Sequence, residues 1–390
     1  MKGRTFANAG DIVASCLYTE EGNDSIISEW LVALRAMHGS RAGVIALVAE
    51  QSKALVPKLQ QAATEAGLAL VGGVFPRVIV EDSFRPDGVV LIGMMHMPDY
   101  ILHGDLNSEN GVRRAVSALR DLVEPQQAKT TLFMIFDGLF DRIASLLEEL
   151  FYEVGTTCKY AGVCGGSETF QPLPCVFDTS RLVADGVIAF LLPNNPGGRL
   201  EHGYIVPEQA LIASSTTGNR VSQIDWQPAF DRYRQLVAEH YGERITHQNF
   251  YQFGVHYPFA LIRGENEILI RIPVAVVDDG SLLCIGEIPQ GALLTVAKAV
   301  LPGSTDTVVK LGNSYKATNA PQGMFFYCAG RRMHLGESAA CSELLELSRF
   351  LPSQPLYGAL TLGEIGQSQP GGYPLFHNAA IVAIPLNSDE

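Results

Sequence analysis

The hydrophobic positions of the chain follow one plan three times: a segment with apolar residues at helical spacing leads into a short apolar strand that ends near glycine. After a polar link, a second apolar strand closes each copy. Apolar residues three to four positions apart predict helices, and short apolar runs bounded by glycine predict strands. The pattern therefore predicts a repeated unit of helix, strand, glycine turn and strand. The copies span residues 52–93 with Gly72 and Gly73, residues 141–192 with Gly165 and Gly166, and residues 342–385 with Gly363.

The segments between these copies change character along the chain. Residues 130–136 form an apolar run before a helical pattern, which predicts a strand-to-helix junction. Residues 227–241 have helical spacing with Pro228 in the expected first turn. From residue 257 to about 311, short β runs alternate with turn residues, which is typical of hairpins.

This change of pattern predicts a two-part architecture with a boundary between residues 220 and 250. We expect an α/β to α+β fold in which mixed β-sheets are flanked by helices. The first part covers residues 1–235 and is α/β in character. The second part covers residues 236–390, with a β-meander before a helix and closing strands.

The glycine turns are candidates for backbone contact with a ligand. Glycine permits a positive φ and a close approach of the backbone, so Gly165 and Gly166 could present N–H groups to a ligand. The same residues could equally serve only to reverse the chain. Three similar turns in one chain favour a shared cavity lined by some of them.

Composition excludes several classes of protein. Apolar residues make up 47% of the 390 residues and charged residues 18%, which predicts a well-packed globular protein. The longest apolar stretch, residues 185–193, is too short for a membrane span, and the N-terminus lacks the apolar region of a secretory signal. We therefore expect a cytoplasmic protein without a membrane partner. The net charge of −13, with no block of Lys or Arg, argues against nucleic acid as a partner.

No standard catalytic signature stands out. The chain lacks the phosphate-binding, zinc-protease and serine-hydrolase motifs, and its seven cysteines have no metal-binding spacing. Cys164 precedes Gly165, Gly166 and Ser167, a position that could suggest a nucleophile, but the sequence assigns it no paired histidine. We predict no metal site, because none of the nine histidines has a ligand spacing, although His96 lies among Met94, Met95 and Met97.

The order of motifs in both halves resembles one known family, the FIST proteins. In the second half the motifs are PFALIR, GEIPQG, MFFYCAGR, YGALTLGEIG and FHN, the last at residues 376–378. In the first half they are GVCGGSE, DGVIAFLL, GGRLEHGY and DWQPA. The resemblance covers residues 40–386 and implies an N-terminal and a C-terminal FIST domain.

The resemblance implies a stand-alone bacterial intracellular sensor of a small ligand, without a cofactor. Amino acids or their derivatives are often proposed as FIST ligands, and a separate signalling protein such as a histidine kinase would receive the signal. We expect the ligand in a cleft between the two parts, where an arginine would suit a carboxylate and Glu364 an amine. The candidate ligand-binding residues are Arg199, His202, Gly165, Gly166, Arg331, Glu364, His377 and Asn378.

Besides a structural scaffold that binds no ligand, two alternatives remain open. The first is a haem-binding nitric oxide sensor that partners a histidine kinase, with His202, His256 or His377 as the haem ligand. The second is an enzyme with Cys164 or Cys328 as its nucleophile, whereas the preferred hypothesis is not an enzyme.

One turn departs from the family pattern. Many bacterial relatives have Gly-Cys-Ser/Thr-x-x-Gly-Glu in the first unit, but this chain has VGGVFPR at residues 71–77. If that turn contacts the ligand in relatives, this protein binds a different molecule.

Overall fold

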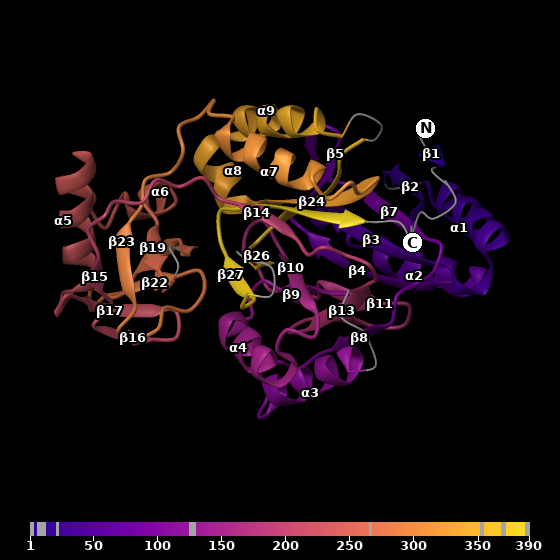
Figure 1. Cartoon of the computed structure of the whole chain (residues 1–390), viewed down its shortest axis with the longest axis horizontal. Helices are drawn as coiled ribbons and strands as arrows, with labels where there is room; N and C mark the ends of the chain where they lie inside the picture. Colours follow the sequence, from indigo (N-terminus) through magenta and orange to yellow (C-terminus); the bar gives the residue numbers. More distant parts are fainter. Residues whose placement is uncertain are drawn as a thin grey trace.

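The computed structural model describes residues 4–5, 13–20, 23–124, 130–264, 267–351, 355–367 and 372–386. These residues form three similar α/β units that interlock, together with a smaller β domain that is inserted into the third unit (Figure 1). The helices of the three units lie on the outside, with the sheets of these units between them, and the inserted domain lies at one end of the molecule (Figure 1). The predicted class of mixed sheets flanked by helices is confirmed.

Unit 1 shows the strand order that all three units share. Its central strand β3 (Gly43–Ala49) pairs in parallel with β4 (Ala69–Phe75) and antiparallel with β7 (Val89–Met94). An outer strand, β2 (Val13–Thr19), pairs antiparallel with β7 and is flanked by the short β1 (Arg4–Thr5). The helices of this unit are α1 (Asp24–His38) and α2 (Leu55–Ala66), and its short 3-10 turns are η1 (Gly39–Arg41) and η2 (Glu50–Ser52).

Units 2 and 3 repeat this order with different sequences. The central strand lies between a parallel and an antiparallel neighbour in each unit, and an outer strand follows the antiparallel one. Unit 2 consists of β8 (Tyr100–His103), α3 (Gly111–Val123), β9 (Thr131–Asp137), α4 (Ile143–Val154), β10 (Lys159–Gly165) and β13 (Val187–Leu192). Unit 3 consists of β14 (Arg199–Glu201), α7 (Asp306–Lys316), β24 (Gln322–Cys328), α8 (Ala329–Leu335), α9 (Glu337–Ser348), β25 (Tyr357–Thr361) and β28 (Ile381–Leu386).

Each unit donates a hairpin to the sheet of another unit, and the exchange is cyclic. The hairpin of unit 1 pairs with β25 of unit 3, that of unit 3 pairs with β10 of unit 2, and that of unit 2 pairs with β4 of unit 1. The units therefore complete one another's sheets. The three hairpins are β5–β6 (Arg77–Val80 and Ser83–Arg85), β11–β12 (Val176–Asp178 and Leu182–Val183) and β26–β27 (Glu364–Gly366 and Leu375–His377).

The inserted domain lies between β14 and α7. It has two small sheets, ordered β15-β23-β19-β20 and β16-β17-β22-β21. Its strands are β15 (Leu211–Ile212), β16 (Ser215–Thr217), β17 (Arg220–Ile224), β18 (Gln227–Pro228), β19 (Phe259–Ile262), β20 (Ile268–Arg271), β21 (Pro273–Val276), β22 (Leu282–Cys284) and β23 (Leu293–Val296). Its helices are α5 (Ala229–Tyr241) and α6 (Phe250–Gly254).

Several predicted elements need new boundaries. The repeat helices begin and end within a few residues of the predicted limits, and Pro228 lies just before α5 rather than inside its first turn. The predicted β runs extended to residue 311, but the last strand of the meander ends at Val296 and residues 306–316 are helical. Residue 235, where the two predicted parts meet, lies within α5, and the division into two domains stays a prediction.

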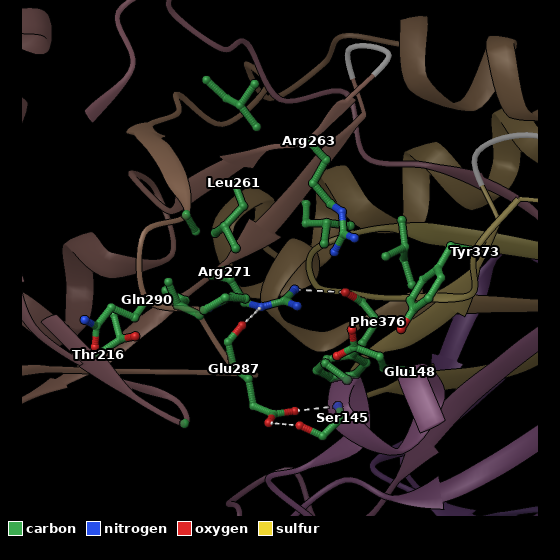
Figure 2. A pocket seen from close by; sticks show the side chains of 18 of the residues that line it. Ser145, Glu148, Thr216, Leu261, Arg263, Arg271, Glu287, Gln290, Tyr373 and Phe376 are labelled. Atoms are coloured by element: carbon green, nitrogen blue, oxygen red, sulfur yellow. Dashed lines mark hydrogen bonds between the residues drawn. The ribbon is translucent and has the colours of Figure 1, made fainter. Parts of the chain in front are cut away.

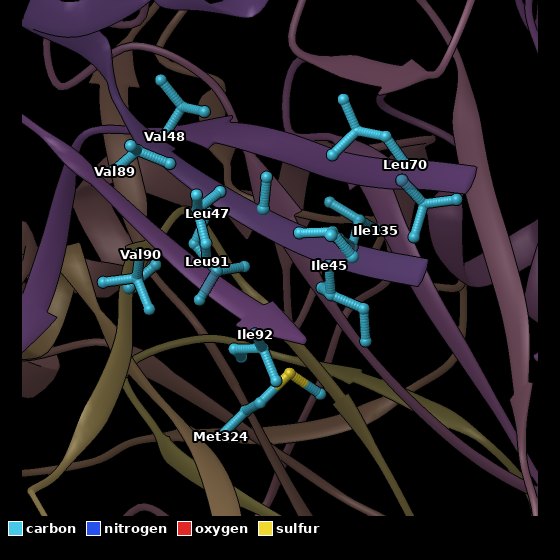
Figure 3. Close-up of a cluster of buried hydrophobic side chains, with 14 of the residues drawn as sticks. Ile45, Leu47, Val48, Leu70, Val89, Val90, Leu91, Ile92, Ile135 and Met324 are labelled. Carbon is cyan, nitrogen blue, oxygen red and sulfur yellow. The ribbon is translucent and has the colours of Figure 1, made fainter. Parts of the chain in front are cut away.

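The largest apolar cluster joins the central strands of all three units. Ile45 and Leu47 of β3 pack with Ile92 of β7, Ile135 of β9 and Met324 of β24 (Figure 3). Both faces of the central strands are buried, so β3 is apolar along its whole length and β9 is apolar between Thr131 and Asp137. Among the described residues, no helix combines the length and the apolar character that a bilayer crossing needs.

Candidate functional site

A pocket of about 560 Å³ lies between the inserted domain and unit 2. One wall is α4, with Ser145 and Glu148, and another is the segment before and within β27, with Tyr373 and Phe376. The remaining walls come from the strands and loops of the inserted domain (Figure 2). The volume lies in the range typical of small-molecule sites.

Arg271, the last residue of β20, places a buried positive charge in this pocket. Its side chain is 2% exposed. Nε donates to the Glu287 carbonyl at 3.0 Å, and Nη1 donates to the Phe376 carbonyl at 2.8 Å (Figure 2). Nη1 also donates to the Ile270 carbonyl at 3.1 Å. Among the described residues no carboxylate lies within ion-pair distance of this guanidinium. Burial lowers the pKa of Arg271 to about 10, because the cation has lost water and the nearby Cys284 and Glu287 offset only part of that loss.

Glu287 connects the inserted domain to unit 2 beside this arginine. Its carboxylate accepts hydrogen bonds from the Ser145 N–H at 2.9 Å and the Ser145 hydroxyl at 2.5 Å (Figure 2). Ser145 is in the first turn of α4, where N–H groups lack partners within the helix and a negative charge is favourable. Glu287 therefore has two contacts: its carbonyl positions Arg271, and its carboxylate holds the inserted domain against α4.

Groups of both charges line the rest of the pocket. Arg263 lies over the Tyr373 ring, with its guanidinium carbon 5.6 Å from the ring centre. Glu148 is exposed on α4, and it raises the pKa of Tyr373 after the larger effect of burial. The pocket thus combines a buried cation with an accessible carboxylate, an arrangement that suits a ligand carrying both charges.

The residues predicted from sequence lie elsewhere. Arg199 and His377 line a separate polar pocket of about 360 Å³. Asn378 lines a narrow pocket of about 40 Å³ with mainly apolar walls. Phe376, His377 and Asn378 are consecutive, so one short segment borders all three pockets.

The charge of Arg331 is already neutralised inside the fold. Its side chain is 1% exposed and binds Glu343 through two hydrogen bonds of 2.6 and 2.8 Å. Its remaining nitrogen, Nη1, donates to the His202 carbonyl at 2.7 Å. The His202 ring accepts the Tyr204 N–H at 3.0 Å, and burial lowers its pKa to about 4. Arg331 and His202 line none of the three pockets.

Glu364 is fully buried at the junction of units 2 and 3. Its carboxyl accepts the Thr361 hydroxyl at 2.5 Å, and burial raises its pKa to about 8. Gly165 and Gly166 let the backbone of unit 2 come close to that of unit 1. A Cβ on Gly165 would lie 2.6 Å from the Val74 carbonyl oxygen, and the same oxygen accepts the Gly166 N–H at 2.8 Å. These three residues also line none of the three pockets.

The groups named by the two alternatives are buried or half-buried in the fold. His256 hydrogen-bonds through Nδ1 to His334, whose Nε2 donates to the Val300 carbonyl at 2.7 Å. His202, His256 and His377 lie outside the 560 Å³ pocket, and the haem alternative stays a prediction.

The Cys164 and Cys328 thiols are buried, which raises their pKa values, whereas a nucleophilic cysteine depends on a lowered pKa. Within the described ranges, no group of three or more His, Cys, Asp or Glu could hold a metal ion.

Arg271 was not among the candidate residues predicted from the sequence, although its position in an apolar strand is unusual for a charged residue. This arginine interrupts the apolar run of residues 268–273, where a charge is costly unless it is paired or used. Its contact with the Phe376 carbonyl joins positions far apart in the chain, which no local pattern predicts.

The fold is thus a set of interlocked α/β units that carries a β insertion, with a charged pocket where the two meet. The chain belongs to the FIST family: the FIST N domain matches residues 44–227 and the FIST C domain matches residues 229–367. FIST domains are generally taken as domains that sense small ligands in signal transduction. The resemblance inferred from the motifs is therefore confirmed. No curated protein matches the chain significantly.

Proposed function

We propose that this protein is a sensor whose ligand is a small zwitterion, such as an amino acid or a close derivative, bound between the inserted domain and unit 2. The observation that carries the proposal is Arg271, a buried guanidinium that lines the pocket; among the described residues its hydrogen bonds go to carbonyls alone, and it lies over the Phe376 ring. A ligand carboxylate would supply the missing counter-ion, and charge-assisted hydrogen bonds of this kind are strong.

The walls of the pocket support both ends of such a ligand. Glu148 is exposed on α4 and would pair with an ammonium group. Tyr373 and Phe376 would contact the apolar part of the molecule. The chemistry matches the amino-acid-like ligand expected from the family, but the residues differ from those the motifs suggested.

The location of the pocket supports a signalling role. The Glu287–Ser145 and Arg271–Phe376 hydrogen bonds hold the inserted domain against units 2 and 3. A ligand that contacts both sides would shift the equilibrium between the docked and the undocked inserted domain. The size of the shift would follow from the difference between its affinities for the two states. We propose that a separate partner, such as a histidine kinase, reads this change.

The test is a thermal-shift screen with the twenty standard amino acids, followed by derivatives of each amino acid that binds. A ligand that binds only the native state raises Tm. The α-carboxamide removes the partner of Arg271, and the N-acetyl derivative removes the partner of Glu148, so both should lose most of the shift. No shift with any of the twenty, or equal shifts with the carboxamide, would overturn the proposal.

A further inference from the structure

We infer that the 360 Å³ pocket between units 2 and 3 is a second binding site, which takes a small molecule through a phosphate or carboxylate group. The pocket lies where Lys159, the first residue of β10, approaches Arg199, the first residue of β14. His377, at the end of β27, forms part of its lining. It shares no lining residue with the 560 Å³ pocket.

The two cations of this pocket lack counter-ions. Within the described part of the chain, neither Lys159 nor Arg199 has a carboxylate partner, and the only hydrogen bond of the Arg199 side chain goes to the Pro196 carbonyl at 3.1 Å. Both side chains are partly buried. Burial lowers the pKa of Lys159, and the charge of Arg199 lowers it further. Two like charges in one partly buried pocket repel each other, so an anion that contacts both relieves the repulsion.

His377 provides an independent observation. Its side chain is 3% exposed, and its buried Nδ1 atom has no hydrogen-bond partner. Burial, together with the charges of His202 and Arg271, lowers its pKa to about 3, so the imidazole is neutral and can carry its proton on Nδ1. Buried polar atoms in folded proteins nearly always have partners, and a ligand oxygen would supply this one.

One carboxylate moderates the charge of the pocket. Glu201 also lines it, and burial raises the pKa of Glu201 while Lys310 opposes that rise. With Glu201 ionised, the three charged side chains of the lining leave a single net positive charge. The site therefore favours a small ligand with one anionic group over an extended polyanion.

The experiment is an NMR titration of protein carrying ¹⁵N-labelled histidine, with inorganic phosphate in one series and acetate in the other. The His377 signal is identified by its loss in His377→Gln. We expect this signal to shift and saturate with at least one of the two anions, and the series that saturates at the lower concentration identifies the anionic group.

Variants separate a specific site from general charge attraction. Lys159→Gln and Arg199→Gln should each weaken binding about tenfold, because each removes a charged partner. Lys316→Gln removes an exposed lysine from α7 without touching the lining and should change affinity less than about twofold. No saturable shift with either anion, or an equal loss in Lys316→Gln, would overturn the inference.

Discussion

Replacing Glu364 by glutamine should remove a large pH dependence from the stability of the fold. The folded pKa of about 8 exceeds the ordinary value of 4.5 by about 3.5, which at about 1.36 kcal/mol per pKa unit corresponds to about 5 kcal/mol. Because the folded state binds this proton more tightly than the unfolded state, the stabilisation is complete below pH 4.5. It is lost progressively as the pH rises to 8. Glutamine keeps an acceptor for the Thr361 hydroxyl and has no charge to bury.

The assay is urea denaturation of the wild type and Glu364→Gln at several pH values from 5 to 9. At each pH, the variant's free energy of unfolding is compared with that of the wild type, so the contributions of titrating groups that both proteins share cancel. We expect the variant to gain several kcal/mol relative to the wild type across this range. The matched control is Glu29→Gln, which removes an exposed carboxylate from α1 and should give a nearly flat difference. A flat or falling difference for Glu364→Gln would refute the reasoning.

Three further predictions concern individual contacts that stabilise the fold. Glu287→Gln should lower the free energy of unfolding in urea by about 1–2 kcal/mol, because α4 loses a charged cap at its first turn. It should also speed hydrogen exchange at the Ser145 amide, and unchanged exchange would contradict this prediction. Arg331→Met should lower the free energy of unfolding by about 3–5 kcal/mol, because it leaves the Glu343 carboxylate buried without its ion-pair partner. Adding Glu343→Leu should recover part of this loss, and no recovery would argue against the ion-pair explanation. Gly165→Ala should lower stability by about 1–3 kcal/mol through its contact with the Val74 carbonyl, and Gly264→Ala, which has open space, should not.

The repeated unit was predictable because its signals are local. Helical spacing and glycine-bounded strands identified α2, α4 and α9 and the strands that follow them. The exchange of hairpins was not predictable, because pairings such as Gly358 with Ile79 join residues far apart in sequence. A strand pattern shows which face is buried but not which strand lies beside it.

The site residues show the same limit. Arg331 fits a ligand contact by residue type, but Glu343 on α9 already neutralises it. Arg271 has the same chemistry in an ordinary apolar strand, yet it lies in a pocket because β20 contacts β27. Residue type alone therefore could not show which arginine is paired inside the fold and which lines a pocket, because the long-range packing decides this.

The most direct test of the ligand site is calorimetric titration of the amino acid that gives the largest thermal shift. We expect Arg271→Lys to bind about tenfold more weakly than the wild type, because lysine lacks the fork that reaches a carboxylate. Glu148→Gln, at an exposed position that does not threaten folding, should weaken binding by a similar factor. Arg244→Gln, an exposed control in the inserted domain, should bind like the wild type. Wild-type affinity in both Arg271→Lys and Glu148→Gln would contradict the account.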